Sequence, residues 1–143
     1  MSLTLETPAV AKSQNADVEV KVDPPYYSSA LTSYQNGDLR AAIHLFKLHL
    51  IDDPKHAESL YNIGVAYVDL EEYPNAIEYY EKCLKVDEEN LNCNLNLGVL
   101  LVQLGRVREG KRKLQRVAEL DPLRPGNLKE YINSLSLQVE FDV

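Results

Sequence analysis

Three histidines and two cysteines are the side chains of this chain most suited to metal binding or nucleophilic chemistry. His49 and Asp53 are four residues apart, which would place both on one face of a helix. Two ligands do not make a metal site, however, and His44, His49 and His56 do not share a helical face. His49 also falls at a position that is expected to be buried and to hold a small residue. This favours a core histidine over a metal ligand. We therefore expect no metal and no cofactor.

Cys83 and Cys93 are the only cysteines among 143 residues, and neither belongs to a Cys-x-x-Cys pair. Their positions favour buried, reduced thiols over a disulfide or a metal site. The sequence has no glycine-rich phosphate loop, no nucleophile elbow and no Cys–His pair at a recognisable spacing. The chain is therefore predicted not to be an enzyme.

Composition narrows the possible partners and compartments. With 45% apolar residues the chain can bury a core, and its net charge of −7 argues against nucleic acid as the main partner. No run of eighteen apolar residues is present, so no membrane insertion is expected. The first residues lack a basic start followed by a long apolar stretch, so we expect no secretory signal and a cytoplasmic location.

Apolar residues recur at helical spacing twice between Ala57 and Asn90, on either side of a polar break from Asp69 to Glu72. This pattern predicts two helices joined as an αα-hairpin. A lone hairpin has apolar residues on too many sides to cover with its own two helices. It therefore needs neighbours. The residues that carry the pattern are Leu60, Ile63, Gly64 and Tyr67, then Tyr73, Ala76, Tyr80, Cys83 and Leu84.

The same pattern returns when the sequence is shifted by 34 residues in either direction. Leu97-Gly98 aligns with Ile63-Gly64, and Gly37 aligns with Glu71. In these residues the chain resembles the tetratricopeptide repeat (TPR) family, whose hairpins have this period. The resemblance implies an all-α, right-handed α-solenoid of three TPR helical hairpins with a C-terminal capping helix. It divides the chain into a flexible arm (1–22), repeats at 23–56, 57–90 and 91–124, a capping helix at about 126–137, and a tail (138–143) that could pack as an extended strip.

Helix boundaries follow from capping residues and from proline and glycine. Asp23-Pro24-Pro25 and Asp53-Pro54 are both interpreted as helix starts, and Gly37 and Gly105 as stops. The expected helices cover about 24–35, 38–52, 54–70, 74–86, 90–104, 107–120 and 127–137.

By resemblance, the first helix of each repeat lines a concave groove that binds a partner segment. The alternative is that the arm or the tail of the chain covers this groove. The predicted partner-binding residues are Tyr27, Leu31, Tyr34, Tyr61, Asn62, Val65, Val68, Leu95, Asn96, Val99 and Val102.

The predicted function is a non-enzymatic protein–protein interaction module, that is, an adaptor, scaffold or assembly factor. Some TPR domains hold the C-terminal carboxylate of chaperones with cationic side chains, and this chain has no cation at the matching positions. One alternative is a chaperone for an aggregation-prone partner, similar to the TPR chaperones of type III secretion. Another is self-association of the acidic second repeat with the basic third repeat.

Overall fold

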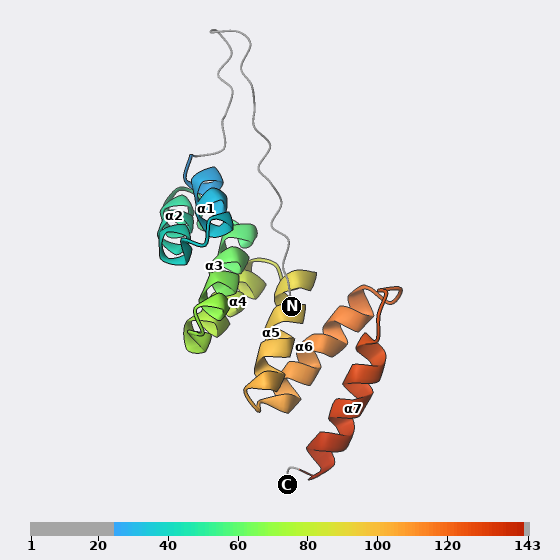
Figure 1. Cartoon of the computed structure of the whole chain (residues 1–143). Coiled ribbons are helices and arrows are strands. Elements are labelled where there is room, and N and C mark those ends of the chain that lie inside the picture. The colour runs from blue at the N-terminus through green and yellow to red at the C-terminus, as the bar shows by residue number, and fades with distance from the viewer. Residues whose placement is uncertain (1–24, 142–143) are drawn as a thin grey trace. The chain divides into compact units, whose positions relative to one another are not determined.

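The computed structural model describes residues 25–141, and every regular element in this range is an α-helix (Figure 1). The predicted arm at 1–22 lies outside the described residues. None of the described helices is long and apolar enough to cross a membrane. The helices are α1 (Pro25–Gln35), α2 (Leu39–Asp52), α3 (Ala57–Asp69), α4 (Tyr73–Val86), α5 (Leu91–Gln103), α6 (Val107–Leu120) and α7 (Leu128–Phe141).

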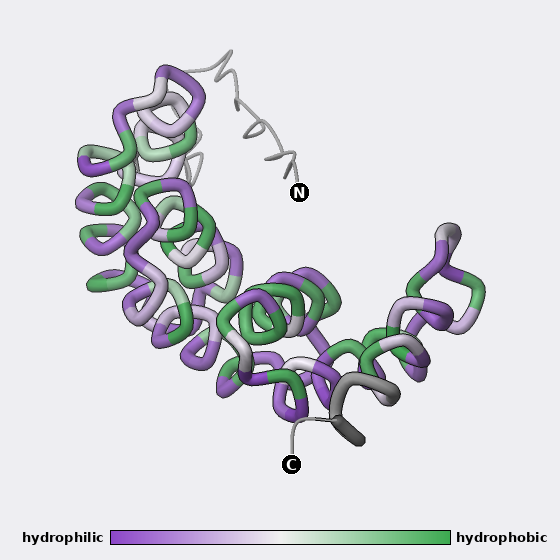
Figure 2. The backbone as a smooth tube through the Cα atoms, turned by 60° about the horizontal axis from the view of Figure 1, so that its bottom comes forward, coloured by the Kyte–Doolittle hydropathy of each residue, from purple (hydrophilic) through white to green (hydrophobic). Residues whose placement is uncertain are grey.

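The chain forms two compact units, one ending at Ala76 and the next beginning at Ile77, within α4. In the first unit α2 packs against both α1 and α3, and in the second α6 packs against both α5 and α7. Figure 2 shows hydrophobic and hydrophilic positions alternating along the helices, as expected for helices that bury one side. The fully buried side chains include Phe46 in the first unit and Leu97 and Leu114 in the second.

The three hairpins share one turn at 34-residue intervals, centred on Gly37, Glu71 and Gly105, all with positive φ. In each, the N–H of the central residue donates to the carbonyl three residues back. The N–H that follows donates to the carbonyl five residues back. This is the Schellman arrangement, which satisfies the last carbonyls of the preceding helix and favours glycine. The shared turn supports the 34-residue repeat frame that the sequence predicted.

A second recurring turn lies between hairpins and corrects one predicted boundary. The N–H of Asp53 donates to the His49 carbonyl over 3.0 Å, so Asp53 ends α2 rather than starting α3. Helix α3 begins at Ala57 instead of Pro54, because His56 is its N-cap and accepts a hydrogen bond from the Ser59 N–H. Asp87 and Asp121 occupy the same turn one and two repeats later.

Helices α5 and α6 approach closely at two glycines, one from each helix. A Cβ atom built on Gly110 would lie 2.6 Å from the Gly98 carbonyl oxygen and 2.9 Å from the Val102 nitrogen. Neither contact is possible for a real side chain without moving the backbone. Gly110, which stands where the first two repeats have Ala42 and Ala76, therefore permits the close approach of these helices.

Helix α7 covers the end of the second unit. Ile132 and Leu135 pack with Leu114 in a cluster that also contacts Leu128 and Tyr131. The predicted packing of a C-terminal helix on the last hairpin is present. Its predicted end at 137 is too early, because the helix continues to Phe141 where an extended strip was expected.

A disulfide joins Cys83 of α4 to Cys93 of α5, with Cα atoms 6.7 Å apart. Both cysteines are fully buried. The prediction of buried side chains is confirmed, and the prediction of reduced thiols is wrong. The two positions face each other because they lie on consecutive helices across a short turn.

Candidate functional site

Tyrosines of α1 are hydrogen-bonded to carboxylates of α3 in the first unit. The Tyr27 hydroxyl donates to Glu58 over 2.9 Å, and the Tyr34 hydroxyl donates to Asp69. Burial of the phenol, together with this bond to Asp69, holds the pKa of Tyr34 well above the usual tyrosine range. The two bonds connect two tyrosines that the TPR resemblance placed in the groove lining to Glu58 and Asp69 of α3. They fix both tyrosine rings at the surface of α1 and α3.

The remaining predicted binding residues of the first unit lie at different depths. Leu31, Asn62 and Val65 are buried, and Tyr61 is 9% exposed. Val68 is half-buried, as are Tyr27 and Tyr34. The accessible surface of this face therefore comes mainly from the two tyrosines and Val68, while the buried residues support it from below.

The Asn62 carboxamide is buried in α3, and its oxygen accepts no hydrogen bond from the described residues. A buried acceptor left unsatisfied costs about 1–3 kcal/mol. An N–H group that reached this oxygen would recover that free energy. Since the oxygen is not accessible from the surface, a ligand would reach it only if the side chains above it moved.

In the second unit, the predicted residues Leu95, Val99 and Val102 of α5 are half-buried. All three pack against the cluster that α7 completes. Part of the predicted apolar strip is therefore used inside the chain, by its own C-terminal helix. Asn96 is 7% exposed and belongs to the buried set.

Two basic residues of the third repeat form ion pairs within the second unit. Arg116 of α6 lies 3.1 Å from Glu89 and 3.1 Å from Glu119, and Arg106, the N-cap residue of α6, lies 2.7 Å from Glu109. Such exposed pairs contribute little stability. They neutralise part of the positive charge on which the self-association alternative depends, and that alternative stays a prediction.

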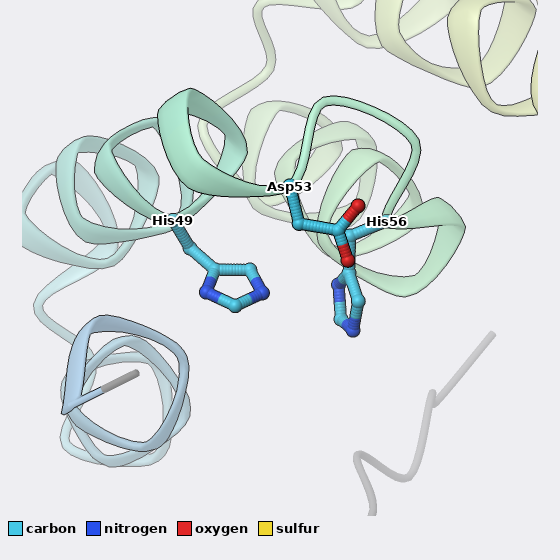
Figure 3. Close-up of side chains that lie close together, drawn as sticks. All are labelled: His49, Asp53 and His56. Carbon is cyan, nitrogen blue, oxygen red and sulfur yellow. The ribbon is translucent and has the colours of Figure 1, made fainter. Parts of the chain in front are cut away.

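A metal-ligand constellation lies where α2 passes into α3 (Figure 3). His49, Asp53 and His56 each offer one ligand atom, and these atoms lie within 4.8 Å of one another. The two imidazole rings are 4.6 Å apart between centroids and nearly perpendicular. Tyr27 packs against both, at 5.5 Å from His49 and 4.9 Å from His56. The sequence analysis paired His49 with Asp53 but missed His56, which comes from the cap of the next helix. The spacing His-x3-Asp-x2-His was the available signal.

Comparison with known proteins identifies the repeat. The family described as tetratricopeptide repeat matches residues 57–90. Photosystem I assembly protein Ycf3 from Synechococcus sp. is 31% identical over 87 residues, which cover 59% of this chain and 50% of that protein. The chain thus spans half the length of this relative, and it spans only 14% and 5% of two longer human relatives.

Two solved structures show the fold. The first TPR of Spaghetti (RPAP3), bound to an HSP90 peptide, has a TM-score of 0.73 at 17% identity, over 81% of this chain and 91% of that one. The Yersinia enterocolitica type III secretion chaperone SycD, in complex with a peptide of the translocator YopD, has a TM-score of 0.69 at 21% identity, over 82% and 91%. Together with the seven described helices, these similarities confirm the predicted helical-solenoid class.

Proposed function

Because this chain belongs to the tetratricopeptide repeat family, we propose that it is a non-enzymatic interaction module that binds a segment of another protein. The observation that carries the proposal is the pair of tyrosines on α1, each held by a carboxylate of α3. Their rings present apolar area in a fixed orientation, so little side-chain entropy is lost on binding. Aromatic residues of this kind dominate the energetics of many interfaces.

The chemistry of the same face suggests the class of segment. Tyr27, Tyr34 and Val68 favour an apolar side chain. The exposed carboxylates Glu58 and Asp69 at its edge favour positive charge beside that side chain. We therefore propose an apolar segment flanked by lysine or arginine.

Photo-crosslinking tests which face binds. A benzophenone amino acid would replace Val68 in α3 and, as controls, Lys82 in α4 or Gln115 in α6. We expect adducts to a partner from the α3 position and none from the control positions. Adducts formed equally from all three positions would contradict the proposed face. Mass spectrometry of the adducts identifies the partner segment.

Expression of the identified partner, alone and together with this chain, separates the adaptor from the chaperone. The known complexes of TPR chaperones with translocator peptides motivate this comparison, although the similarity to them extends only to the fold. A chaperone partner would aggregate when expressed alone and stay soluble when expressed with this chain. An adaptor's partner would be soluble in both cases.

A further inference from the structure

We propose that His49, Asp53 and His56 form a binding site for a divalent transition-metal ion of the Zn²⁺ class, which joins the end of α2 to the start of α3. Two imidazoles and one carboxylate are a ligand set typical of Zn²⁺, with one position left for water. This site adjoins the proposed partner-binding face, because Tyr27 packs against both imidazole rings, but none of its three ligands belongs to that face.

The geometry needs only a small closure. Ligands bound tetrahedrally at about 2.0–2.1 Å from Zn²⁺ are about 3.4 Å apart, against separations within 4.8 Å here. Asp53 is exposed, so its side chain is free to rotate toward the rings, whereas His49 is buried and gives the site a fixed point. The Asp53 carboxylate and the His49 ring both point toward His56 (Figure 3).

A buried serine holds the third ligand. The Nδ1 atom of His56 lies 2.7 Å from the Ser59 hydroxyl oxygen and accepts from the Ser59 N–H over 3.2 Å. A metal-bound imidazole is oriented by its other ring nitrogen, which donates a hydrogen bond. A His56 bound to metal through Nε2 would carry its proton on Nδ1 and donate it to the Ser59 hydroxyl oxygen. The Ser59 N–H also lies 3.1 Å from the His56 carbonyl oxygen. Helix α3 therefore keeps a hydrogen bond at its first turn if the imidazole changes tautomer on binding metal.

Comparison between repeats shows which of the three ligands the fold itself requires. The aspartate of the turn is present in every repeat, as Asp53, Asp87 and Asp121, so its structural role explains it without a metal. The histidines are different, because the repeat equivalents of His56 are Asn90 and Arg124. Those of His49 are Cys83 and Val117. Only one repeat therefore has the two histidines, which lie on either side of the aspartate that all three repeats have in common.

The next junction between repeats is cross-linked by the disulfide, which indicates what a metal at the histidines would do for the structure. Cys83 is the repeat equivalent of His49, and Cys93 is the equivalent of Ser59, which holds His56. The disulfide between these cysteines fastens α4 to α5. A metal at the histidines would fasten α2 to α3 at the corresponding place, by coordination instead of a covalent bond.

Calorimetric titration of the full chain with Zn²⁺ tests the proposal. The protein is stripped with chelator and kept oxidised, so that cysteine thiolates do not compete for the ion. We expect about one Zn²⁺ per chain and a melting temperature that rises with Zn²⁺ concentration, because the ion binds the folded state. Co²⁺ in place of Zn²⁺ should give the visible absorption of a tetrahedral site.

Three variants assign the ligands. His56→Asn removes the imidazole but keeps a residue that caps the equivalent helix at Asn90, and Asp53→Asn removes the charge at nearly constant shape. Each should weaken Zn²⁺ binding at least about tenfold, on the scale seen when metal-site partners are lost. His44→Gln, on the exposed side of α2, should bind as the wild type does. Wild-type affinity in His56→Asn or Asp53→Asn, or the absence of Zn²⁺ binding by the wild type, would overturn the proposal.

Discussion

Glu71 stands where the other two hairpins have glycine, at φ +59°. A side chain in this left-handed region costs about 1–2 kcal/mol, and the negative charge also lies at the unfavourable C-terminal end of α3. We predict that Glu71→Gly raises the free energy of unfolding by about 0.5–1 kcal/mol, after allowing for the greater freedom of glycine in the unfolded chain. Urea denaturation measures the change.

Gly105→Ala is the reciprocal control. An added Cβ at Gly105 meets no atom within 4 Å, so any loss of stability comes from the backbone at φ +85°. A loss of about 1 kcal/mol is expected. If Glu71→Gly destabilised the protein while Gly105→Ala did not, the shared-turn interpretation would fail.

Gly110 tests the close approach of α5 and α6. Alanine is the better helix former by about 1 kcal/mol, yet its Cβ would lie 2.6 Å from the Gly98 carbonyl oxygen. Overpacking of this kind costs about 1–3 kcal/mol. The atom that the new Cβ would meet belongs to the backbone of α5, which moves less easily than a side chain. We therefore predict that Gly110→Ala lowers the melting temperature. Gln115→Ala, exposed on the same helix, should leave it unchanged. A melting temperature raised by Gly110→Ala would show that the helices are farther apart than described.

At the scale of elements, α7 is expected to be essential to the second unit. Leu135 is 3% exposed and packs on Leu114, so Leu135→Ala should cost about 2–5 kcal/mol. Asn133→Ala, exposed on the same helix, is the control and should have little effect. Unfolding followed by circular dichroism in urea measures both. Equal stability of the two variants would mean that α7 does not pack on α6.

The disulfide makes a separate prediction at this scale. It closes a loop of ten residues between α4 and α5, for which loss of the cross-link costs about 2–3 kcal/mol on the loop-entropy estimate. We expect a reductant to lower the melting temperature of the wild type and to leave that of Cys83→Ser/Cys93→Ser unchanged.

A thiol assay of the unfolded, unreduced protein should find no free thiol. Two free thiols would contradict the disulfide. Disulfides are rare in the cytosol, so the assay is best made on protein isolated from its own cells. The cytoplasmic location of the chain stays a prediction.

The sequence specified the elements well because local signals and the repeat agreed. Gly37 and Gly105 marked hairpin turns, and the 34-residue shift placed Glu71 at the third turn although its residue type gives no such signal. Asp53-Pro54 misled, since an aspartate before a proline can end one helix as well as begin the next. The N-cap of α3 shows that this helix begins at Ala57, and the cap depends on a hydrogen bond from the Ser59 N–H to the His56 ring.

Contacts between helices were harder to predict than the helices. Cys83 and Cys93 gave no sequence motif, because their pairing depends on the angle at which α4 passes into α5. His56 joins His49 for a similar reason, through the turn at Asp53. The burial of Leu31, Asn62 and Val65 was also hidden, because the family pattern names the face on which a residue lies but not its depth.

At the scale of the whole molecule, the proposed function is the binding of a partner segment by the face that α1 and α3 form. Tyr61 of α3 is one of the predicted partner-binding residues, and we expect it to lie at the centre of that face, since its phenol is close enough to Tyr34 to raise the pKa of Tyr34. Truncation of a central aromatic residue often costs 2 kcal/mol or more of binding free energy. Tyr61 is only 9% exposed, so its replacement must also be controlled for lost stability.

Tyr67 supplies that control. It lies in the same helix and is 7% exposed, but its hydroxyl accepts a hydrogen bond from Lys47 of α2 over 3.0 Å, on another side of α3. Tyr67→Ala should lower the melting temperature about as much as Tyr61→Ala does. Lys82→Ala, exposed on α4, controls for a charge change away from the face.

Calorimetry with the crosslinked segment, made as a synthetic peptide, tests the claim most directly. The titration compares the wild type with Tyr61→Ala, Tyr67→Ala and Lys82→Ala at a temperature where all four are folded. We predict that Tyr61→Ala weakens binding at least about tenfold, as expected for a central aromatic residue, while the other two variants bind as the wild type does. Equal affinities for the wild type and Tyr61→Ala, or an equal loss in Tyr67→Ala, would place the binding site on another face of the molecule.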